Sequence, residues 1–598
     1  MMNEEVILKE FNAKHQKTAD LIKEFVPSEP FKASLVNGHS VILGPRGSGK
    51  TTILRMLAND ALPYWNGENA SLFRESFPYE GIYVGGDKVW AEIISSLSKL
   101  NISTNAAETL AISAFNTCIF VSATEAFINS YQLKSSSLGS DALKSLKISL
   151  IKSIKEIANI LLIQMNGISL ESLKFSLEKR QQEIGSLAYK LSHGYQMTEN
   201  EIFDQYPYLT IKFKNTFDMM LGLFDSALDR PANHKWALLL DEFEIAPEAL
   251  QNDVLSDLRS SSKKFIYKIA LIPCRGYLKH VRSGSERNIK SSKNNDYNII
   301  ELWHKSKNEI QEFFSHFIKA KYKNTPLALF GETPFLENST LEWGEKWGDV
   351  FEELGDKDAT FREYMEKKGM DYKDVKNLKR KPDDWLRKVA PIVAYRNEFR
   401  NEQGNTRTRK SLETLYAGWQ AIAAISEGNP RWLILTLNTL VNNPKELPIS
   451  RAAQAQQVTE SSKTYWAMLK TAALKDNLGI STSRSPSQLI QSIGECLKEN
   501  VVNEAFNEDP YLSFEVDKNE LPDVINALKI ALNYGALISM TQGGDIEDYD
   551  DLKDKRFRVS YLLAPKLGLP LRASKARKLS TILGKDKTIK NTEQGKLF

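Results

Sequence analysis

Five short apolar runs, each followed by sequence with apolar residues at helical spacing, occur in the first 302 residues of the chain. Runs of this length predict buried β-strands, and strands that alternate with helices predict a parallel sheet covered by helices on both faces. The runs lie at 39–43, 81–85, 236–240, 265–273 and 298–302. The expected fold class is therefore α/β.

The same pattern divides the chain into six expected parts. Between the second and third strands the spacing is helical throughout, which predicts an insertion with its own packing. The parts are 1–90 (lead-in and first part of the core), 91–231 (helical insertion), 232–323 (second part of the core), 324–385 (a charged, aromatic insertion), 386–450 (helical lid) and 451–598 (winged-helix-like domain and basic tail).

The pattern of the last part predicts a helix followed by a two-stranded wing. An amphipathic helix at 521–534 is closed by Gly535, and strands are expected at 536–540 and 557–562. The turn between these strands is acidic and would repel phosphate. Its carboxylates are Asp545, Glu547, Asp548, Asp550 and Asp551.

Composition limits the classes of protein that remain. The 598 residues are 42% hydrophobic and carry a net charge of +4, so any nucleic-acid surface must be a local patch. Three scattered cysteines fit a reducing compartment and supply no zinc site. The longest uncharged run, 109–124, is shorter than the roughly 20 residues of a membrane span. We expect a cytoplasmic protein with no membrane partner, and a buried helix at this run.

A phosphate-binding loop follows the first strand. The sequence GPRGSGKT satisfies G-x-x-x-x-G-K-[ST] between a strand and a helix, where backbone N–H groups and the helix N-terminus can hold phosphate. The alternative is a plain glycine-rich turn. The expected nucleotide contacts are Gly44, Pro45, Arg46, Gly47, Ser48, Gly49, Lys50, Thr51 and Thr52.

This loop predicts ATP and Mg²⁺ as ligands. Lys50 is expected to reach the β- and γ-phosphates, and the Thr51 hydroxyl to bind Mg²⁺. The third strand ends in Asp241 and Glu242. Asp241 is expected to hold Mg²⁺ and Glu242 to polarise the attacking water, whereas the alternative is a buried strand that ends in a solvated acidic turn.

Two arginines are further candidates. P-loop ATPases commonly place a polar residue that senses the γ-phosphate after the fourth of these strands, where Arg275 stands. Arg431 follows Asn429-Pro430 in the first turn of a helix and could reach the nucleotide from a lid. The alternatives are a surface arginine and a helix-start arginine, respectively.

The segments GPRGSGKTT, LLLDEFE, LIPCRG and EGNPRWL, in this order, resemble the bacterial branch of the origin-recognition-complex-type AAA+ ATPases. They are also similar to the related STAND signalling ATPases. The resemblance implies an AAA+-type P-loop core with a helical lid and a C-terminal winged helix, and a sensor strand between the phosphate-loop strand and the acidic strand. It also implies a setting in anti-phage or mobile-element systems.

The expected function is Mg²⁺-dependent ATP hydrolysis coupled to oligomeric assembly or to nucleic-acid engagement. The alternatives are a nucleotide-gated scaffold for a partner effector protein and a DNA replication initiator or loader. Arg275, Arg407 and Arg409 exceed what one pocket needs, which favours a homo-oligomer or a hetero-complex. If nucleic acid binds, basic residues at 263–293 and in the C-terminal tail are the expected contacts.

Overall fold

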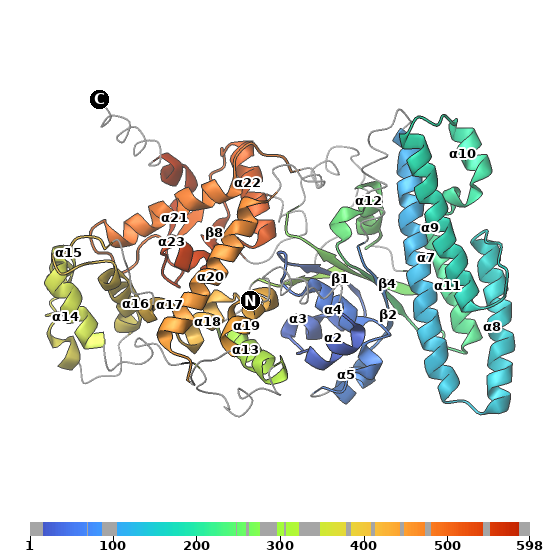
Figure 1. The fold of residues 1–598 in the computed structure, drawn as a ribbon, viewed down its shortest axis with the longest axis horizontal. Coiled ribbons are helices and arrows are strands. Elements are labelled where there is room, and N and C mark those ends of the chain that lie inside the picture. Colours follow the sequence, from blue (N-terminus) through green and yellow to red (C-terminus); the bar gives the residue numbers. More distant parts are fainter. Residues whose placement is uncertain are drawn as a thin grey trace.

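The structure is a computed structural model of the chain (Figure 1). It describes residues 16–67, 70–86, 104–246, 248–258, 262, 264–274, 296–303, 307–321, 336, 347–377, 384–407, 413–442, 448–472, 480–541 and 551–584.

A five-stranded sheet forms the centre of the molecule. Its strands are β1 (His39–Leu43), β2 (Glu80–Val84), β3 (Trp236–Leu240), β4 (Phe265–Leu271) and β5 (Tyr297–Glu301). They run parallel in the order β2-β3-β4-β1-β5. The mixed α/β class and the parallel sheet are confirmed, and β4 lies between the strands of the phosphate loop and of the acidic pair.

Alternating side chains of the sheet enter two different cores. Val41 and Leu43 point to the face covered by the long helices of the 104–227 region. Ile42 and Leu239 point to the opposite face, where N-terminal helices cover the sheet. These N-terminal helices are α2 (Thr18–Glu24), α3 (Glu29–Ser34), α4 (Lys50–Leu57) and α5 (Ala70–Ser76). Both faces are therefore buried, which explains why the strands are almost continuously apolar.

Long helices form an arm at one end of the molecule (Figure 1). They are α7 (Thr104–Ser136), α8 (Ser140–Ile160), α9 (Leu170–Ser192), α10 (Glu199–Gln205) and α11 (Phe213–Ala227), and α12 (Glu248–Asp257) follows β3. Within α7, residues 106–136 are long and apolar enough to cross a membrane. However, 67% of their most apolar window is buried inside the structure, as in a core helix.

Polar contacts attach this arm to the sheet. The Asn59 side chain donates to the Ala126 carbonyl at 2.7 Å and to Ser130 Oγ at 3.0 Å, both on α7. Glu80 at the start of β2 forms an ion pair with Arg230, which follows α11. Because these groups are buried or half-buried, breaking one side of such a contact leaves a polar group without its partner.

The rest of the chain lies at the other end of the molecule from the arm (Figure 1). Its helices are α13 (Lys307–Lys321), α14 (Trp347–Lys357), α15 (Ala359–Lys367), α16 (Asp384–Glu398), α17 (Glu413–Tyr416), α18 (Trp419–Ile425), α19 (Pro430–Asn442), α20 (Arg451–Lys470), α21 (Pro486–Val502), α22 (Pro522–Tyr534) and α23 (Ala564–Leu567). Arg396 of α16 is buried against Asp358 at 2.6 Å and donates to the Val501 carbonyl at 2.8 Å, which joins α16 to α21.

A second sheet, with the order β7-β8-β6-β9, differs from the predicted two-stranded wing. Its strands are β6 (Ser513–Glu515), β7 (Leu537–Ser539), β8 (Arg556–Val559) and β9 (Ala576–Lys578). The β7–β8 pair matches the predicted strands. The other two were missed because each combines a length of three residues with polar or charged positions: β6 is Ser-Phe-Glu, and β9 (Ala-Arg-Lys) has the polar sequence of a tail.

One lysine is fully buried in the central sheet. Lys268 of β4 donates to the Val36 carbonyl at 2.8 Å and to Ser40 Oγ at 3.0 Å. Burial lowers the pKa of its ammonium group from 10.5 to about 7. The folded protein therefore carries a destabilising cost whenever this group is charged.

Substituting Lys268→Met is expected to change how stability depends on pH. The unfolded chain keeps the lysine proton to about pH 10.4, whereas folded Lys268 releases it near pH 7. Between these values the unfolded state binds more protons, so the free energy of unfolding rises with pH, by at most roughly 1.4 kcal/mol per pH unit. Urea unfolding at pH 7 and pH 9 should show a steeper rise for the wild type than for Lys268→Met. Equal rises would contradict this expectation.

Candidate nucleotide-binding site

The predicted phosphate loop connects β1 to α4, and its backbone has the expected shape. Gly47 and Gly49 have φ angles of +83° and +96°, a region that favours glycine. Gly49 is the N-cap residue of α4, and Lys50 is the first residue of that helix. The backbone N–H groups of the loop and of the N-terminus of α4 therefore lie together, in an arrangement that binds anions well.

The Lys50 side chain folds back onto this loop. Its Nζ donates to the carbonyls of Gly44 at 2.6 Å and of Pro45 at 3.0 Å. Burial lowers the pKa of Lys50, and the nearby carboxylates of Glu244 and Asp241 act in the opposite direction. The ammonium group is thus held in place by weak neutral acceptors, which a phosphate oxygen can replace.

Ser48 supplies the test of whether a phosphate group fits. Its side chain is buried, and among the described residues its Oγ has no hydrogen-bond partner. A buried hydroxyl without a partner is costly in a folded protein. A phosphate oxygen at the loop would accept its hydrogen bond, so the residues present fit a phosphate group.

Asp241 and Thr51 meet at the carboxyl end of the sheet. Asp241, buried at the end of β3, forms a side-chain hydrogen bond with Thr51 and accepts one from the Tyr83 hydroxyl at 2.9 Å. Burial raises the pKa of Asp241, whereas these two hydrogen bonds lower it. The structure therefore brings together the two residues predicted to hold Mg²⁺.

Glu242 has an unusual backbone conformation. Its φ of +48° lies in the left-handed region, which is uncommon for a residue with a side chain and is often found at functional sites. Its N–H donates to Asp241 Oδ1 at 3.0 Å. A Cβ atom added at Gly86 would lie 2.8 Å from both Cβ and Oε2 of Glu242. Gly86 thus leaves room for the Glu242 carboxylate beside the end of β2.

Arg431 lies against the phosphate loop. A Cβ atom added at Gly47 would be 3.0 Å from the Cβ of Arg431, which is the second residue of α19. Burial lowers the pKa of Arg431, the charge of Arg46 lowers it further, and Glu242 raises it. The helix-start arginine therefore lies in the electrostatic field of the loop and of the acidic pair. Arg275 and Arg409 lie outside the described residues.

The sequence did not identify three residues that support this site. Tyr83 and Gly86 lie on and just after β2, and only their closeness to a strand end could have pointed to them. Glu427, which precedes the Asn429-Pro430 step, forms two 2.7 Å hydrogen bonds with Arg558 of β8. This pair connects the segment that carries Arg431 to the C-terminal sheet.

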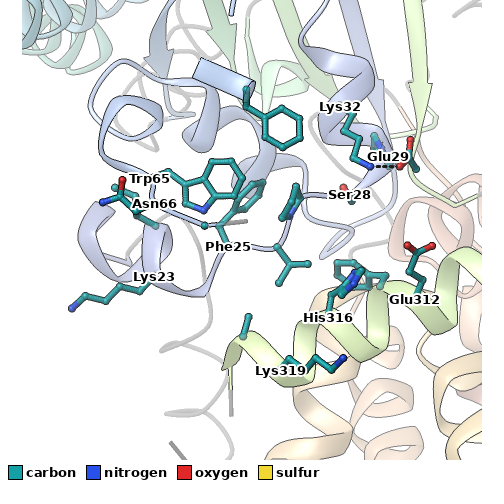
Figure 2. Close-up of a pocket in the computed structure, with 18 of the residues that line it drawn as sticks. Lys23, Phe25, Ser28, Glu29, Lys32, Trp65, Asn66, Glu312, His316 and Lys319 are labelled. Atoms are coloured by element: carbon teal, nitrogen blue, oxygen red, sulfur yellow. Dashed lines mark hydrogen bonds and ion pairs between the residues drawn. The ribbon is translucent and has the colours of Figure 1, made fainter. Parts of the chain in front are cut away.

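A groove of about 1040 Å³ lies elsewhere, between the N-terminal helices and α13 (Figure 2). Phe25 and Trp65 line one side, and Glu312 and His316 of α13 line the other. No residue of the phosphate loop lines it. The groove is therefore separate from the phosphate site.

Several cations predicted to meet nucleic acid are already paired. Lys264 lies 2.9 Å from Asp225, and Lys578 forms an ion pair with Glu515. Arg577 lies 3.8 Å from Glu504. Lys268 is buried in the central sheet. The remaining basic residues of 263–293, the tail beyond 584, and the wing acids Asp545, Glu547, Asp548 and Asp550 lie outside the described residues. In the described part, these pairs reduce the charge available for phosphate contacts.

A parallel sheet with a phosphate loop after β1, and with an acidic pair at the end of a strand two positions away, has the arrangement of a P-loop nucleotide-binding core. The family model named ORC-CDC6-like matches residues 6–579, nearly the whole chain. The protein belongs to the ORC-CDC6-like family, so the predicted membership of the origin-recognition-type AAA+ ATPases is confirmed.

The two other comparisons give no match. No curated protein and no solved structure matches the chain.

Proposed function

We propose that the protein is a Mg²⁺-dependent ATPase that couples ATP binding and hydrolysis to assembly or to nucleic-acid engagement. One observation carries the proposal: Lys50, the adjacent pair Asp241 and Glu242, and Arg431 come from three separate chain segments and converge on one phosphate loop. Convergence of cations and carboxylates around a helix N-terminus is the arrangement that phosphoryl transfer requires.

Each side chain has a distinct task in this proposal. Lys50 and Arg431 neutralise phosphate charge, and Ser48 donates a hydrogen bond to a phosphate oxygen. Thr51 and Asp241 would hold Mg²⁺, which would supply positive charge against the charge that develops during the reaction. Glu242 orients the attacking water and accepts its proton. Tyr83 keeps the Asp241 carboxylate in position through its 2.9 Å hydrogen bond.

The C-terminal half would transmit the state of this site. We assign residues 386–450, which include α17 to α19, to the lid, and residues 451–598, which include α20 to α23 and the second sheet, to a winged-helix-like domain with a basic tail. The bidentate Glu427–Arg558 pair supports transmission between these two parts, because it would make them move together. An oligomer or a complex with an effector protein is the expected assembly.

A nucleotide-gated scaffold is the second candidate, and a packing contact favours it. Phe243, which follows Glu242, has its ring 5.9 Å from that of Phe115 on α7. The helical arm therefore touches the acidic loop directly, and a change at that loop would reach the arm. The family favours the third candidate, a replication initiator or loader.

The proposal is tested by measuring ATP turnover and DNA binding on the same purified protein. We expect phosphate release with ATP and Mg²⁺, and none when EDTA removes the metal. Absence of release at any protein concentration, combined with tight ATP binding, would favour the scaffold instead. DNA affinity that falls steeply with salt, with a slope of several units, would favour the initiator or loader.

A further inference from the structure

The C-terminal end of α22 contacts the nucleotide site at two places. Asn533 is buried, and its side chain forms two hydrogen bonds with the backbone of Cys274, which follows β4. The Cys274 N–H donates to Asn533 Oδ1 at 2.8 Å, and Asn533 Nδ2 donates to the Cys274 carbonyl at 2.9 Å. One side chain thereby fixes the backbone immediately before Arg275, the predicted sensor.

The second contact is with the phosphate loop. The Arg46 N–H donates to the backbone carbonyl of Asn533 at 3.0 Å, and the Arg46 guanidinium lies 4.9 Å from the centre of the Tyr534 ring. A Cβ atom added at Gly535, which ends α22 with φ of +83°, would lie 3.3 Å from Pro45. Backbone carbonyls at a helix C-terminus lack partners within the helix, so here the phosphate loop supplies one.

A third contact fixes this end of α22 to its own domain. The Tyr465 hydroxyl of α20 donates to the Tyr534 carbonyl at 3.0 Å. The end of α22 is therefore held between α20 on one side and the loop and β4 on the other. A displacement of the C-terminal part would break the contacts to Cys274 and Arg46 together.

We propose that Asn533 is a positioning residue that couples the C-terminal domain to the nucleotide site, so that ATP binding and docking of α22 strengthen each other. That the two strengthen rather than weaken each other follows from the charges around the loop. Docking of the C-terminal half brings Arg431 against the loop that carries Arg46 and Lys50, and these cations repel each other until phosphate neutralises them. The inference rests on the proposed ATP site, whose regulation it describes.

The experiment compares Asn533→Ala with Asn500→Ala. Asn500 is also a buried asparagine whose Oδ1 accepts a backbone N–H, from Tyr511 at 2.7 Å, and its Nδ2 donates to Glu504, so these two hydrogen bonds go to the loop after α21. ATP affinity is measured by calorimetry with Mg²⁺. Backbone hydrogen exchange is measured with and without ATP for peptides that cover 44–46, 271–274 and 530–536.

We expect Asn533→Ala to bind ATP about tenfold more weakly than the wild type, because two buried hydrogen bonds are lost. ATP should slow exchange at 530–536 in the wild type and in Asn500→Ala, but not in Asn533→Ala. Asn533→Asp keeps the acceptor for the Cys274 N–H and loses the donor, so its ATP affinity should lie between those of the wild type and of Asn533→Ala. This variant also tests the proposal if Asn533→Ala fails to fold.

Two outcomes would separate the inference from the function on which it rests. Wild-type affinity and wild-type protection at 530–536 in both Asn533 variants would overturn the coupling and leave the ATP site intact. A wild-type protein that binds no ATP would instead overturn the proposed function itself. Equal losses in Asn533→Ala and Asn500→Ala would reduce Asn533 to a residue needed for stability, and would also overturn the inference.

Discussion

Glu242→Gln is expected to bind ATP as tightly as the wild type and to hydrolyse it roughly a hundredfold more slowly, or slower still. The amide has the shape of the carboxylate but cannot accept a proton from water. The strained backbone of Glu242, with φ of +48°, supports a functional role for this side chain, because strain of this kind clusters at active sites. Phosphate release and nucleotide affinity, measured on the same preparation, check both halves of the expectation.

Two further variants make this test specific. Glu244 lies two residues after Glu242 and near Lys50. Glu244→Gln removes its negative charge and should keep most of the activity. Gly86→Ala places a methyl group against Glu242 and should lower the hydrolysis rate with little effect on ATP affinity. If Glu244→Gln stops hydrolysis while Glu242→Gln does not, the assignment of Glu242 as the catalytic base is wrong.

The parts of the candidate site whose shape can be predicted from the sequence depend on local order. Glycines at 47 and 49 are needed at positive φ, and a lysine and a threonine begin the next helix, so the loop can be recognised without any distant contact. The meeting of Asp241 with Thr51 follows from a parallel sheet, because the carboxyl ends of all strands lie at one edge.

The parts that the sequence did not predict depend on pairings between distant segments. Asn533 bonds to Cys274, which is 259 residues away in the chain, and nothing in the local pattern of α22 distinguishes it from an ordinary helix-end asparagine. Similarly, β9 becomes a strand only because β6 offers a parallel partner. In both cases a short polar segment acquires its role from the surface on which it packs.

Lys50→Ala is expected to abolish detectable ATP binding, which corresponds to a loss of roughly a hundredfold or more in affinity. The fold should survive, since the bonds of Lys50 to described residues go to the carbonyls of Gly44 and Pro45, at the start of its own loop. Lys268→Met is the matched control. It also removes a buried lysine that bonds to two oxygens, but these oxygens belong to Val36 and Ser40, around the start of β1 and away from the phosphate loop.

ATP is titrated into the two variants in a calorimeter, at a pH where both fold. The comparison distinguishes the loss of the phosphate site in Lys50→Ala from the general effect of removing a buried lysine in Lys268→Met. Binding that persists in Lys50→Ala, or that disappears equally in Lys268→Met, would show that the phosphate loop is not where ATP binds. The expected result is a normal isotherm for Lys268→Met and no heat for Lys50→Ala. Of these two lysines, we expect the one at the N-terminus of α4 to place its charge among the phosphates, because it begins the helix that follows the phosphate loop.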